Sequence, residues 1–373
     1  MEIRCHREPL SRCLAVVARA AATHSALPVL ANVLLDASDG VLRLSATDLT
    51  VAVSLDVPGA TIVERGSLTA PARLVSDLVK SLPGETVTLR GEDGALAVLA
   101  DRFDTHVRAI PADEFPAVAL TGEPLARLRW ATLQRAIRQV AIAASKEESR
   151  PVLTGLLLRL QGAELTVAAA DGFRLAEANV AVDEAHGELE VVVPAAALLE
   201  AARLPGNGEQ TVEVLASPGG ARIGLRFPGG QVAAQSIEGR FPDYRQVIPG
   251  QAVTRVVGER AALLKAARIG AQFLDDLSGP IVLSVTGDGV RGGQLRVEAA
   301  NAELGDTCTV EPISMQGPDM TVRIAARYLI DGLAAIESAQ AALELTDPST
   351  AIVLRPADEA CCLYVAMPIL PTE

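Results

Sequence analysis

Two adjacent pairs of carboxylates, Asp275 with Asp276 and Glu147 with Glu148, are the residues whose types could perform acid–base chemistry. General acid–base catalysis requires groups that converge on one substrate, whereas neighbouring carboxylates on a helix point in different directions and usually face solvent. The sequence has no nucleophile elbow, metal-binding motif or dinucleotide fingerprint to accompany them. We therefore predict that the protein is not an enzyme. An enzyme remains the rival hypothesis from a different functional class.

The cysteines and histidines give no sign of a disulfide framework or a metal site. The five cysteines are an odd number without C-x-x-C spacing, and the four histidines are far apart in the sequence. The cysteines are Cys5, Cys13, Cys308, Cys361 and Cys362, and the histidines are His6, His24, His106 and His186. We expect buried thiols at the adjacent pair of cysteines, and we expect no cofactor.

The composition is that of a globular protein that can bury a sizeable core. The 373 residues are 49% hydrophobic and 21% charged, which allows two or three domains. No apolar run is long enough to span a membrane, and the first ten residues lack the apolar core of a signal peptide, so we expect a cytoplasmic location. The net charge of −13 disfavours binding to nucleic acid unless the 33 Lys and Arg residues gather on one surface.

The chain contains an internal repeat. The segment LPVLANVLLDASDGVLRLSATDL aligns with RPVLTGLLLRLQGAELTVAAADG at a constant offset of 123 residues. This offset places Pro28 on Pro151 and Asp48 on Asp171, and it also matches APARLVSDLVKSLP to VPAAALLEAARLP. A repeat of this length predicts a structural unit that is used more than once.

A third copy follows, in GPIVLSVTGDGVRGGQLRVEAANAE and IAARYLIDGLAAI, with Asn301 at the position of the repeated aspartate. The unit is therefore about 120 residues long and occurs three times, and we place the domains at residues 1–120, 121–251 and 252–373. Because the Asp171–Gly172 pair is one instance of a repeated turn, we interpret it as structural rather than catalytic.

The periodicities inside the first copy predict two helices and six to eight strands per unit. Residues 7–22 and 72–82 have helical spacing, and short alternating segments separated by Gly, Asp or Pro indicate strands. These strand segments are residues 32–38, 41–48, 51–57, 86–92, 96–101 and 103–110. Helices combined with antiparallel sheet, without a βαβ order, predict an α+β fold.

Basic residues concentrate on the predicted helices of this acidic chain. They outnumber the acidic residues on the same segments, which are Glu8, Asp77, Glu200, Glu259 and Asp331. The basic set is Arg7, Arg12, Arg19, Arg73, Lys80, Arg135, Arg138, Arg203, Arg260, Lys265, Arg268 and Arg327. On one helix this would be a solvated face, but its repetition in three copies predicts one basic surface that binds a polyanion without sequence preference.

Simple geometry limits how such units could surround DNA. A unit of 120 residues has a diameter of roughly 35 Å. Three touching spheres of this size leave a hole about 5 Å wide, six leave about 35 Å, and a duplex is about 20 Å across. Two chains joined head to tail are therefore needed to encircle DNA.

At this point the whole sequence resembles the β subunit of bacterial DNA polymerase III, the replicative sliding clamp family. The segments that carry the resemblance are LPVLANVLL, ATDL, RPVLTGLLL, DGFRLA, GRFPDYRQVIP and the terminal YVAMPIL. The resemblance implies a homodimeric ring of six domains with helices lining the hole and sheets outside. Such a ring is a processivity factor in DNA replication: it slides on double-stranded DNA and is loaded by a clamp loader.

The resemblance also implies a pocket between the second and third domains that binds short motifs of the DNA polymerase III catalytic subunit and other partners. Its residues would be Leu153, Ala170, Gly172, Phe173, Arg174, Leu175, Pro242, Gln246, Val247, Ser349, Ala351, Val365, Ala366, Met367, Pro368 and Ile369. Arg174 would form its polar edge. The family more often has Thr at Ala170, His at Phe173 and a basic residue at Gln246, so peptide preference is expected to differ.

Two further sets of residues follow from the charge pattern and the resemblance. The DNA-facing set is His24, Arg73, Lys80, Arg135, Arg138, Lys146, Arg150, Arg203, Lys265 and Arg268. The dimer-interface set is Leu74, Leu78, Val107, Phe273 and Leu274. The alternative within this family is a clamp paralogue or peptide-binding scaffold that does not serve the main replicase.

Overall fold

The computed structural model describes residues 1–92, 94–118, 120, 122–204, 209–289, 292–358 and 361–370. The chain divides into two compact units, one of residues 1–131 and 182–237 and the other of residues 132–181 and 238–373. The described residues form six α-helices and antiparallel sheets. This mixture confirms the predicted α+β class.

The first unit contains two antiparallel sheets. In spatial order, the larger sheet consists of β14 (Glu184–Ala185), β10 (Ala126–Arg129), β16 (Thr211–Ala216), β17 (Arg222–Phe227), β18 (Gly230–Gln235), β4 (Val51–Asp56), β3 (Arg43–Thr47), β2 (Asn32–Asp36) and β6 (Ser67–Pro71). The smaller sheet consists of β5 (Thr61–Glu64), β1 (Glu2–His6), β7 (Thr86–Glu92), β8 (Ala95–Ala100) and β9 (Phe103–Arg108). The strand β15 (Leu189–Pro194) also belongs to this unit.

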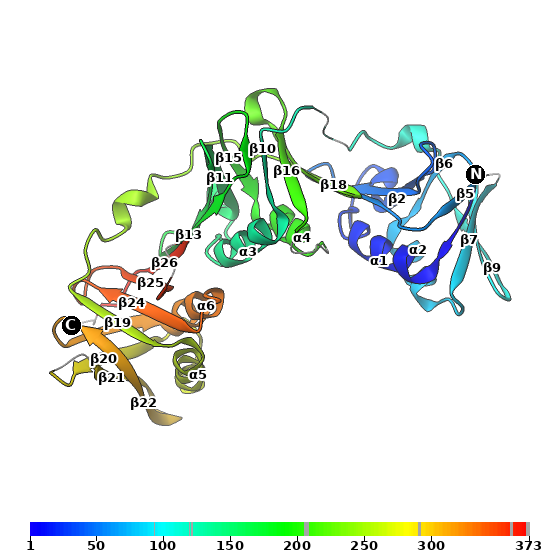
Figure 1. Ribbon diagram of the computed structural model, residues 1–373. Helices are drawn as coiled ribbons and strands as arrows, with labels where there is room; N and C mark the ends of the chain where they lie inside the picture. The colour runs from blue at the N-terminus through cyan, green and yellow to red at the C-terminus, as the bar shows by residue number, and fades with distance from the viewer. Residues whose placement is uncertain are drawn as a thin grey trace. The chain divides into compact units, whose positions relative to one another are not determined.

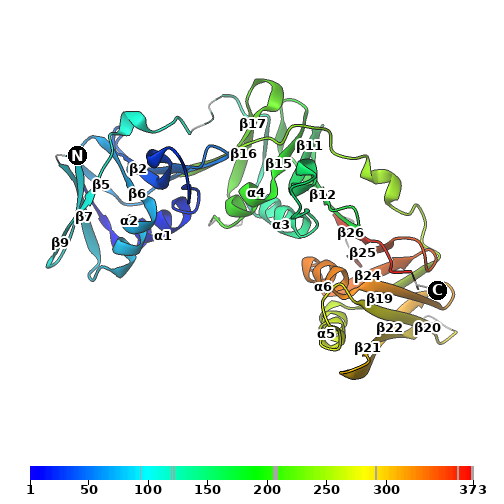
Figure 2. The same cartoon turned by 180° about the vertical axis from the view of Figure 1, so that it is seen from behind.

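Three helices of the first unit form because apolar residues recur with helical spacing. Leu10, Leu14 and Val17 form the buried side of α1 (Arg7–Val17), while Val75 and Val79 lie on the buried side of α2 (Ala72–Ser81). Figures 1 and 2 show α1 and α2 side by side against the strands of the first repeat. The third helix is α4 (Ala195–Ala202).

The second unit is organised around one extended antiparallel sheet. Its strands are, in order, β11 (Gly155–Gln161), β12 (Glu164–Ala170), β13 (Arg174–Ala181), β26 (Cys362–Ala366), β25 (Ile352–Pro356), β24 (Gln340–Leu345), β19 (Thr254–Glu259), β22 (Gly305–Gln316), β21 (Gly292–Asn301), β20 (Pro280–Gly287) and β23 (Met320–Ala325). Its helices are α3 (Trp130–Ala141), whose first two residues belong to the first unit, α5 (Arg260–Ala271) and α6 (Ala326–Ala335). The helices α5 and α6 pack against each other and against this sheet (Figure 2).

The repeat predicted from the sequence is visible in individual hydrogen bonds. The Oδ1 atom of Asp48 accepts bonds from the backbone N–H groups two and three residues later, at 2.9 and 2.8 Å. Asp171 makes the same pair of bonds at 3.0 Å each, and Asn301 makes them at 2.8 and 3.1 Å. These Asx turns confirm that the repeated Asp or Asn closes a turn between two strands.

Some local predictions were wrong. The first repeat has nine strands among its described residues, more than the expected six to eight, because the short strands β1, β5 and β6 show too few alternations to be recognised. The first helix ends at Val17, five residues before the end of the predicted segment. The carboxylate pairs at 147–148 and 275–276 lie in loops rather than on helices.

Candidate functional site

An apolar pocket of about 290 Å³ lies in the second unit, beside the turn between β12 and β13. We call it the apolar pocket and define it by its lining residues. These are Arg150, Leu153, Ala170, Gly172, Phe173, Arg174, Leu175, Pro242, Asp243, Tyr244, Val247, Val365 and Met367. The lining is mostly hydrophobic, which suits apolar side chains of a bound segment.

The structure brings together ten of the sixteen residues predicted for this pocket. Gln246, Ser349, Ala351, Ala366, Pro368 and Ile369 are not among its lining residues. Ala351 and Ala366 are buried beneath the surface, and Ile369 lines a neighbouring hollow instead. Three lining residues were missed: Arg150, which was predicted to face DNA instead, and Asp243 and Tyr244, although the FPDY segment that contains these two was recognised.

The turn between β12 and β13 positions the exposed side of the pocket. Gly172 has a φ of +94°, in the left-handed region that favours glycine, and the Asx turn of Asp171 fixes the next two backbone amides. As a result the Phe173 side chain projects outward and is 64% exposed. The sequence pattern predicted the turn, and the structure shows that it presents an aromatic ring.

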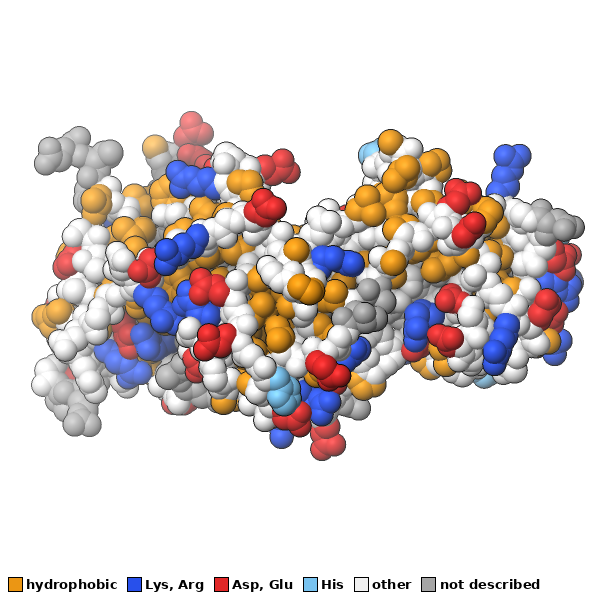
Figure 3. Space-filling view, turned by 90° about the horizontal axis from the view of Figure 1, so that it is seen from above, with side chains coloured by type: hydrophobic (Ala, Val, Ile, Leu, Met, Phe, Trp, Pro, Cys, Tyr) orange, Lys and Arg blue, Asp and Glu red, His pale blue; other side chains and the backbone are white. Residues whose placement is uncertain are grey.

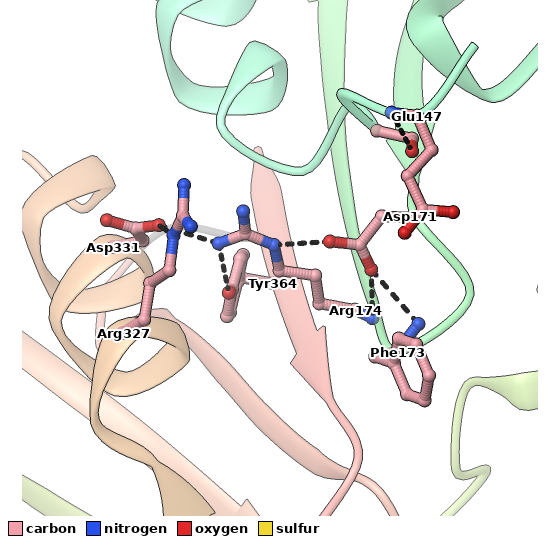
Figure 4. Close-up of polar contacts among 8 residues, drawn as sticks. Glu147, Asp171, Phe173, Arg174, Arg327, Asp331 and Tyr364 are labelled. Atoms are coloured by element: carbon pink, nitrogen blue, oxygen red, sulfur yellow. Dashed lines mark hydrogen bonds and ion pairs between the residues drawn. The ribbon is translucent and has the colours of Figure 1, made fainter. Parts of the chain in front are cut away.

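Arg174 has a different environment from the predicted polar edge, because its side chain is only 5% exposed. In Figure 4 its guanidinium lies between Asp171 and Asp331, at 2.8 and 2.6 Å, and Tyr364 lies 3.4 Å away. It also stacks over the ring of Tyr328 at 4.8 Å. Arg174 therefore joins the second and third repeats beneath the pocket.

Burial and charge act in opposite directions on the pKa of Arg174. Burial lowers it, but Tyr364, Asp331 and Asp171 together raise the pKa above its ordinary value. Burial has the opposite effect on Tyr364, whose pKa it raises because the charged form is the deprotonated one, and Arg174 acts against this increase. At neutral pH the network consists of a charged arginine and a neutral phenol.

The linker that follows the second repeat is anchored by aromatic residues. Tyr244, at the start of the short helix η5 (Tyr244–Val247), donates a hydrogen bond to Glu177 of β13 and packs edge-on against Phe241 at 5.9 Å. Burial is the main reason why the pKa of Tyr244 is raised. Gln246 donates a bond to Asp243 at 2.8 Å, so this amide turns towards the linker itself.

The residues predicted to face DNA lie on helices and adjoining loops. Arg135 is half-buried, and the other nine are exposed. Arg73 and Lys80 lie on α2, Arg135 and Arg138 on α3, and Lys265 and Arg268 on α5. His24, Lys146, Arg150 and Arg203 lie in loops.

The residues predicted for the dimer interface differ in exposure. Leu74 is exposed on α2, while Leu78, Phe273 and Leu274 are partly exposed. Val107 is only 4% exposed, because it packs inside the smaller sheet of its own chain. The side chain of Val107 is therefore not available at the surface of this chain, contrary to the prediction.

The remaining surface and composition add three observations. On the face drawn in Figure 3, basic and acidic side chains are mixed, and hydrophobic side chains form patches between them. Within the described ranges, no helix is long and apolar enough to cross a membrane. Among the same residues, no group of three or more His, Cys, Asp or Glu could hold a metal ion.

Comparison with protein-family models matches the three domains of the DNA polymerase III beta subunit. The N-terminal domain model matches residues 1–119, the central domain model residues 127–243 and the C-terminal domain model residues 245–370. These matches cover nearly the whole chain.

Individual relatives agree with the family models. The chain is 31% identical to a beta sliding clamp from Synechococcus elongatus and 30% identical to one from Streptomyces coelicolor, with 99% of each chain covered. Its fold is similar to that of DNA polymerase III subunit beta from Pseudomonas aeruginosa, with a TM-score of 0.89, 29% identity and full coverage of both chains. A P. aeruginosa clamp bound to griselimycin is 28% identical, with a TM-score of 0.90 and full coverage of both chains.

These relatives are non-enzymatic sliding clamps that act with DNA and DNA polymerase, and no comparison favours the alternative of a paralogue outside replication. The order of the three matched domain models along the chain and the full-length structural match agree with the same family. The chain therefore belongs to the DNA polymerase III beta subunit family and is a DNA sliding clamp.

Proposed function

We propose that two copies of this chain join head to tail into a closed ring of six domains around duplex DNA. A dimeric ring is typical of the family. The observation that carries the proposal is a pair of unused strand edges in the described part of the chain: β22, the strand after the repeated turn in the third repeat, and β9, the last strand of the first repeat. The domains would run over residues 1–120, 121–251 and 252–373, as the repeats suggest.

Both junctions between successive repeats use the same strand pairing. In the first unit, Val51 of β4 pairs with Ala234 of β18, and in the second unit Arg174 of β13 pairs with Ala366 of β26. Val51 and Arg174 are equivalent, because each closes the turn begun by the repeated aspartate. Each junction therefore joins the strand after this turn to the last strand of the next repeat.

Within the residues that the structure describes, the third repeat has an unused edge on the strand that follows its turn, β22, and the first repeat has an unused edge on its last strand, β9. Among the described residues, β22 pairs over 305–313 with β21 alone, and β9 has β8 as its ladder neighbour. A second copy that repeated the internal junction would pair its β9 with this edge of β22.

The internal junctions also predict the register of this pairing. The third turn is one residue longer than the other two, so the residue equivalent to Arg174 in the strand ladder is Gly305, one residue after the turn-closing Leu304. Gly305 lies opposite Asn301, as the carbonyl of Arg174 accepts the backbone hydrogen bond of Asp171 across the second turn. Val107 is the counterpart of Ala366. Each lies three residues before an isoleucine, Ile110 or Ile369, and the backbone N–H of that isoleucine donates a hydrogen bond to the strand that precedes the second helix of its repeat, β6 or β23. Pairing Gly305 with Val107 of a second copy places Cys308 opposite Asp104.

A cysteine substitution tests this register directly. Asp104→Cys should form a disulfide with the exposed Cys308 of a second copy, because Cα atoms directly opposite in an antiparallel pair are about 4.5 to 5.5 Å apart. We expect a covalent dimer on a non-reducing gel after mild oxidation. His106→Cys, two residues away on the same strand face, is the matched control and should remain mostly monomeric; equal crosslinking of both variants would contradict the register.

The exposed basic residues on α2, α3 and α5 support the proposal that the helices face the DNA. Contacts to phosphate carry no sequence information, so they would allow the ring to slide. After loader-catalysed loading, the protein should remain on a nicked circle at high salt and leave it once the circle is linearised. Loss from both forms at high salt would show an ordinary electrostatic complex instead of a ring.

We further propose that the apolar pocket binds short linear motifs of partner proteins. These would include the DNA polymerase III catalytic subunit and the clamp loader, which would place the protein in the cytoplasm with the chromosome. The pocket's hydrophobic lining and the griselimycin complex of the P. aeruginosa relative support this assignment. A labelled clamp-binding segment of the host polymerase should bind, and griselimycin should displace it; Leu175→Arg should abolish binding.

A further inference from the structure

A second hollow adjoins the apolar pocket and differs from it in charge. Its volume is about 810 Å³, and we call it the charged hollow. Its lining residues are Ala144, Ser145, Lys146, Glu147, Ser149, Arg150, Leu153, Asp171, Gly172, Phe173, Arg174, Ser278, Ala325, Arg327, Tyr328 and Ile369. Lys146, Glu147 and Arg327 line this hollow but not the apolar pocket.

The two hollows share one wall. Arg150, Leu153, Gly172, Phe173 and Arg174 line both of them, and the exposed ring of Phe173 turns away from the buried network of Arg174 (Figure 4). A chain segment seated in the apolar pocket therefore has a continuous surface along which to extend. An extended segment of three residues covers about 10 Å.

The charged hollow has an excess of available positive charge. Among the described residues, Lys146 and Arg150 form no ion pair, and Arg327 is 3.7 Å from Asp331 with its side chain 46% exposed. Arg174 and Asp171 neutralise each other, which leaves Glu147 as the exposed carboxylate of the lining. This surplus of cations is local, because the chain as a whole carries a net charge of −13.

We propose that the charged hollow binds acidic residues that flank the apolar anchor of a partner peptide. Lys146, Arg150 and Arg327 provide the charge complementarity, and the shared wall provides continuity with the anchor. The inference rests on the proposed peptide-binding role of the apolar pocket, and it makes Lys146 and Arg327 determinants of partner specificity.

Binding of matched peptides tests the proposal. The probes are the labelled clamp-binding segment of the host polymerase, alone or extended by three aspartates or three asparagines at either end, measured by fluorescence polarisation. With the favourable end extended, the aspartate peptide should bind about tenfold more tightly than the asparagine peptide at low ionic strength, as expected for three solvent-exposed charge contacts. The preference should weaken at high salt because these contacts are screened.

Substitutions identify the groups responsible. Lys146→Gln and Arg327→Gln should each reduce the aspartate-to-asparagine ratio, and the double variant should bring it close to one. Glu147→Gln should increase the ratio, because it removes the opposing carboxylate. Arg323→Gln is the matched control, since it removes an exposed positive charge of the same unit that lines neither hollow, and it should leave the ratio unchanged.

The outcomes separate this inference from the assignment of the apolar pocket. If the unextended segment fails to bind, the pocket assignment and the inference both fall. Binding without an aspartate preference at either end overturns the inference alone. The double variant gives a third outcome. If it keeps the aspartate preference but is retained more weakly on loaded nicked circles, Lys146 and Arg327 face DNA rather than the peptide, and the inference is overturned.

Discussion

Removal of the Arg174 side chain should destabilise the protein more than removal of any nearby exposed arginine. Arg174→Ala leaves Asp171 and Asp331 without their shared cation and removes the contact with Tyr328. Breaking a buried ion pair by removing one partner costs about 3 to 5 kcal/mol. We expect about 3 kcal/mol here, the lower end of that range, because both carboxylates retain some contact with solvent.

The matched control is Arg327→Ala, which removes a cation from the same Asp331. This pair is 3.7 Å apart and exposed to solvent, so its loss should cost less than about 1 kcal/mol. Urea unfolding followed by circular dichroism would measure both, at one fixed protein concentration, because association changes apparent stability. The first transition is the relevant one, since a chain of several domains need not unfold in a single step.

The pH dependence of this effect has a definite sign. The folded-state pKa of Arg174 is raised above its ordinary value, so its contribution is fully present at every pH below that ordinary value and is lost only at a strongly alkaline pH above it. The difference between the native protein and Arg174→Ala should therefore remain constant from about pH 6 to about pH 9. Equal stability losses in Arg174→Ala and Arg327→Ala would refute the assignment of Arg174 as the central cation of a buried network.

Two further predictions concern backbone strain and thiol burial. Leu49 is exposed and has a φ of +76° at the position equivalent to Gly172, so Leu49→Gly should raise the free energy of unfolding by about 0.5 to 1 kcal/mol. Gly172→Ala should lower the free energy of unfolding by about 1 to 2 kcal/mol because of the positive φ, although nothing lies near the added Cβ. A change of the same sign at both positions would contradict the strain argument. Burial raises the pKa of the Cys5 thiol from 9.0 to about 12, so iodoacetamide at mildly alkaline pH should modify the exposed Cys308 well before Cys5, as measured by mass spectrometry. The contribution of Cys5 to the free energy of unfolding should be lost as the pH rises from 9.0 towards 12, because the unfolded thiol ionises first. Comparable labelling rates at the two cysteines would show that Cys5 is accessible.

The local predictions succeeded where contacts between near neighbours in the sequence stabilise the element and its pattern is long enough to recognise. The turn at Asp171 and Gly172 was predicted because an Asx residue followed by glycine closes a turn through its own neighbouring amides. The helix at 72–81 was predicted because apolar residues such as Val75 and Val79 recur there with helical spacing. The short strand β1 was missed, because five residues carry too little periodicity.

The pocket was predicted only in part because its lining is contributed by segments far apart in the chain. The family resemblance supplied Leu153, Phe173 and Met367, which do line it. It did not supply Tyr244, whose place depends on a hydrogen bond to Glu177 across 67 residues. Sequence spacing has no information about such a contact until the sheet has brought both segments together.

The sequence by itself determined the three repeats, the turns that close them, the basic character of the helices and membership of the clamp family. The tertiary structure alone decided that Arg174 is buried, because its partners Asp331 and Tyr364 are 157 and 190 residues away. It also decided which strand edges remain unpaired and that a charged hollow adjoins the apolar pocket. The physical reason is that turns and helices are stabilised by contacts between near neighbours, whereas burial, charge pairing and free edges depend on which distant segments the folded sheet places side by side.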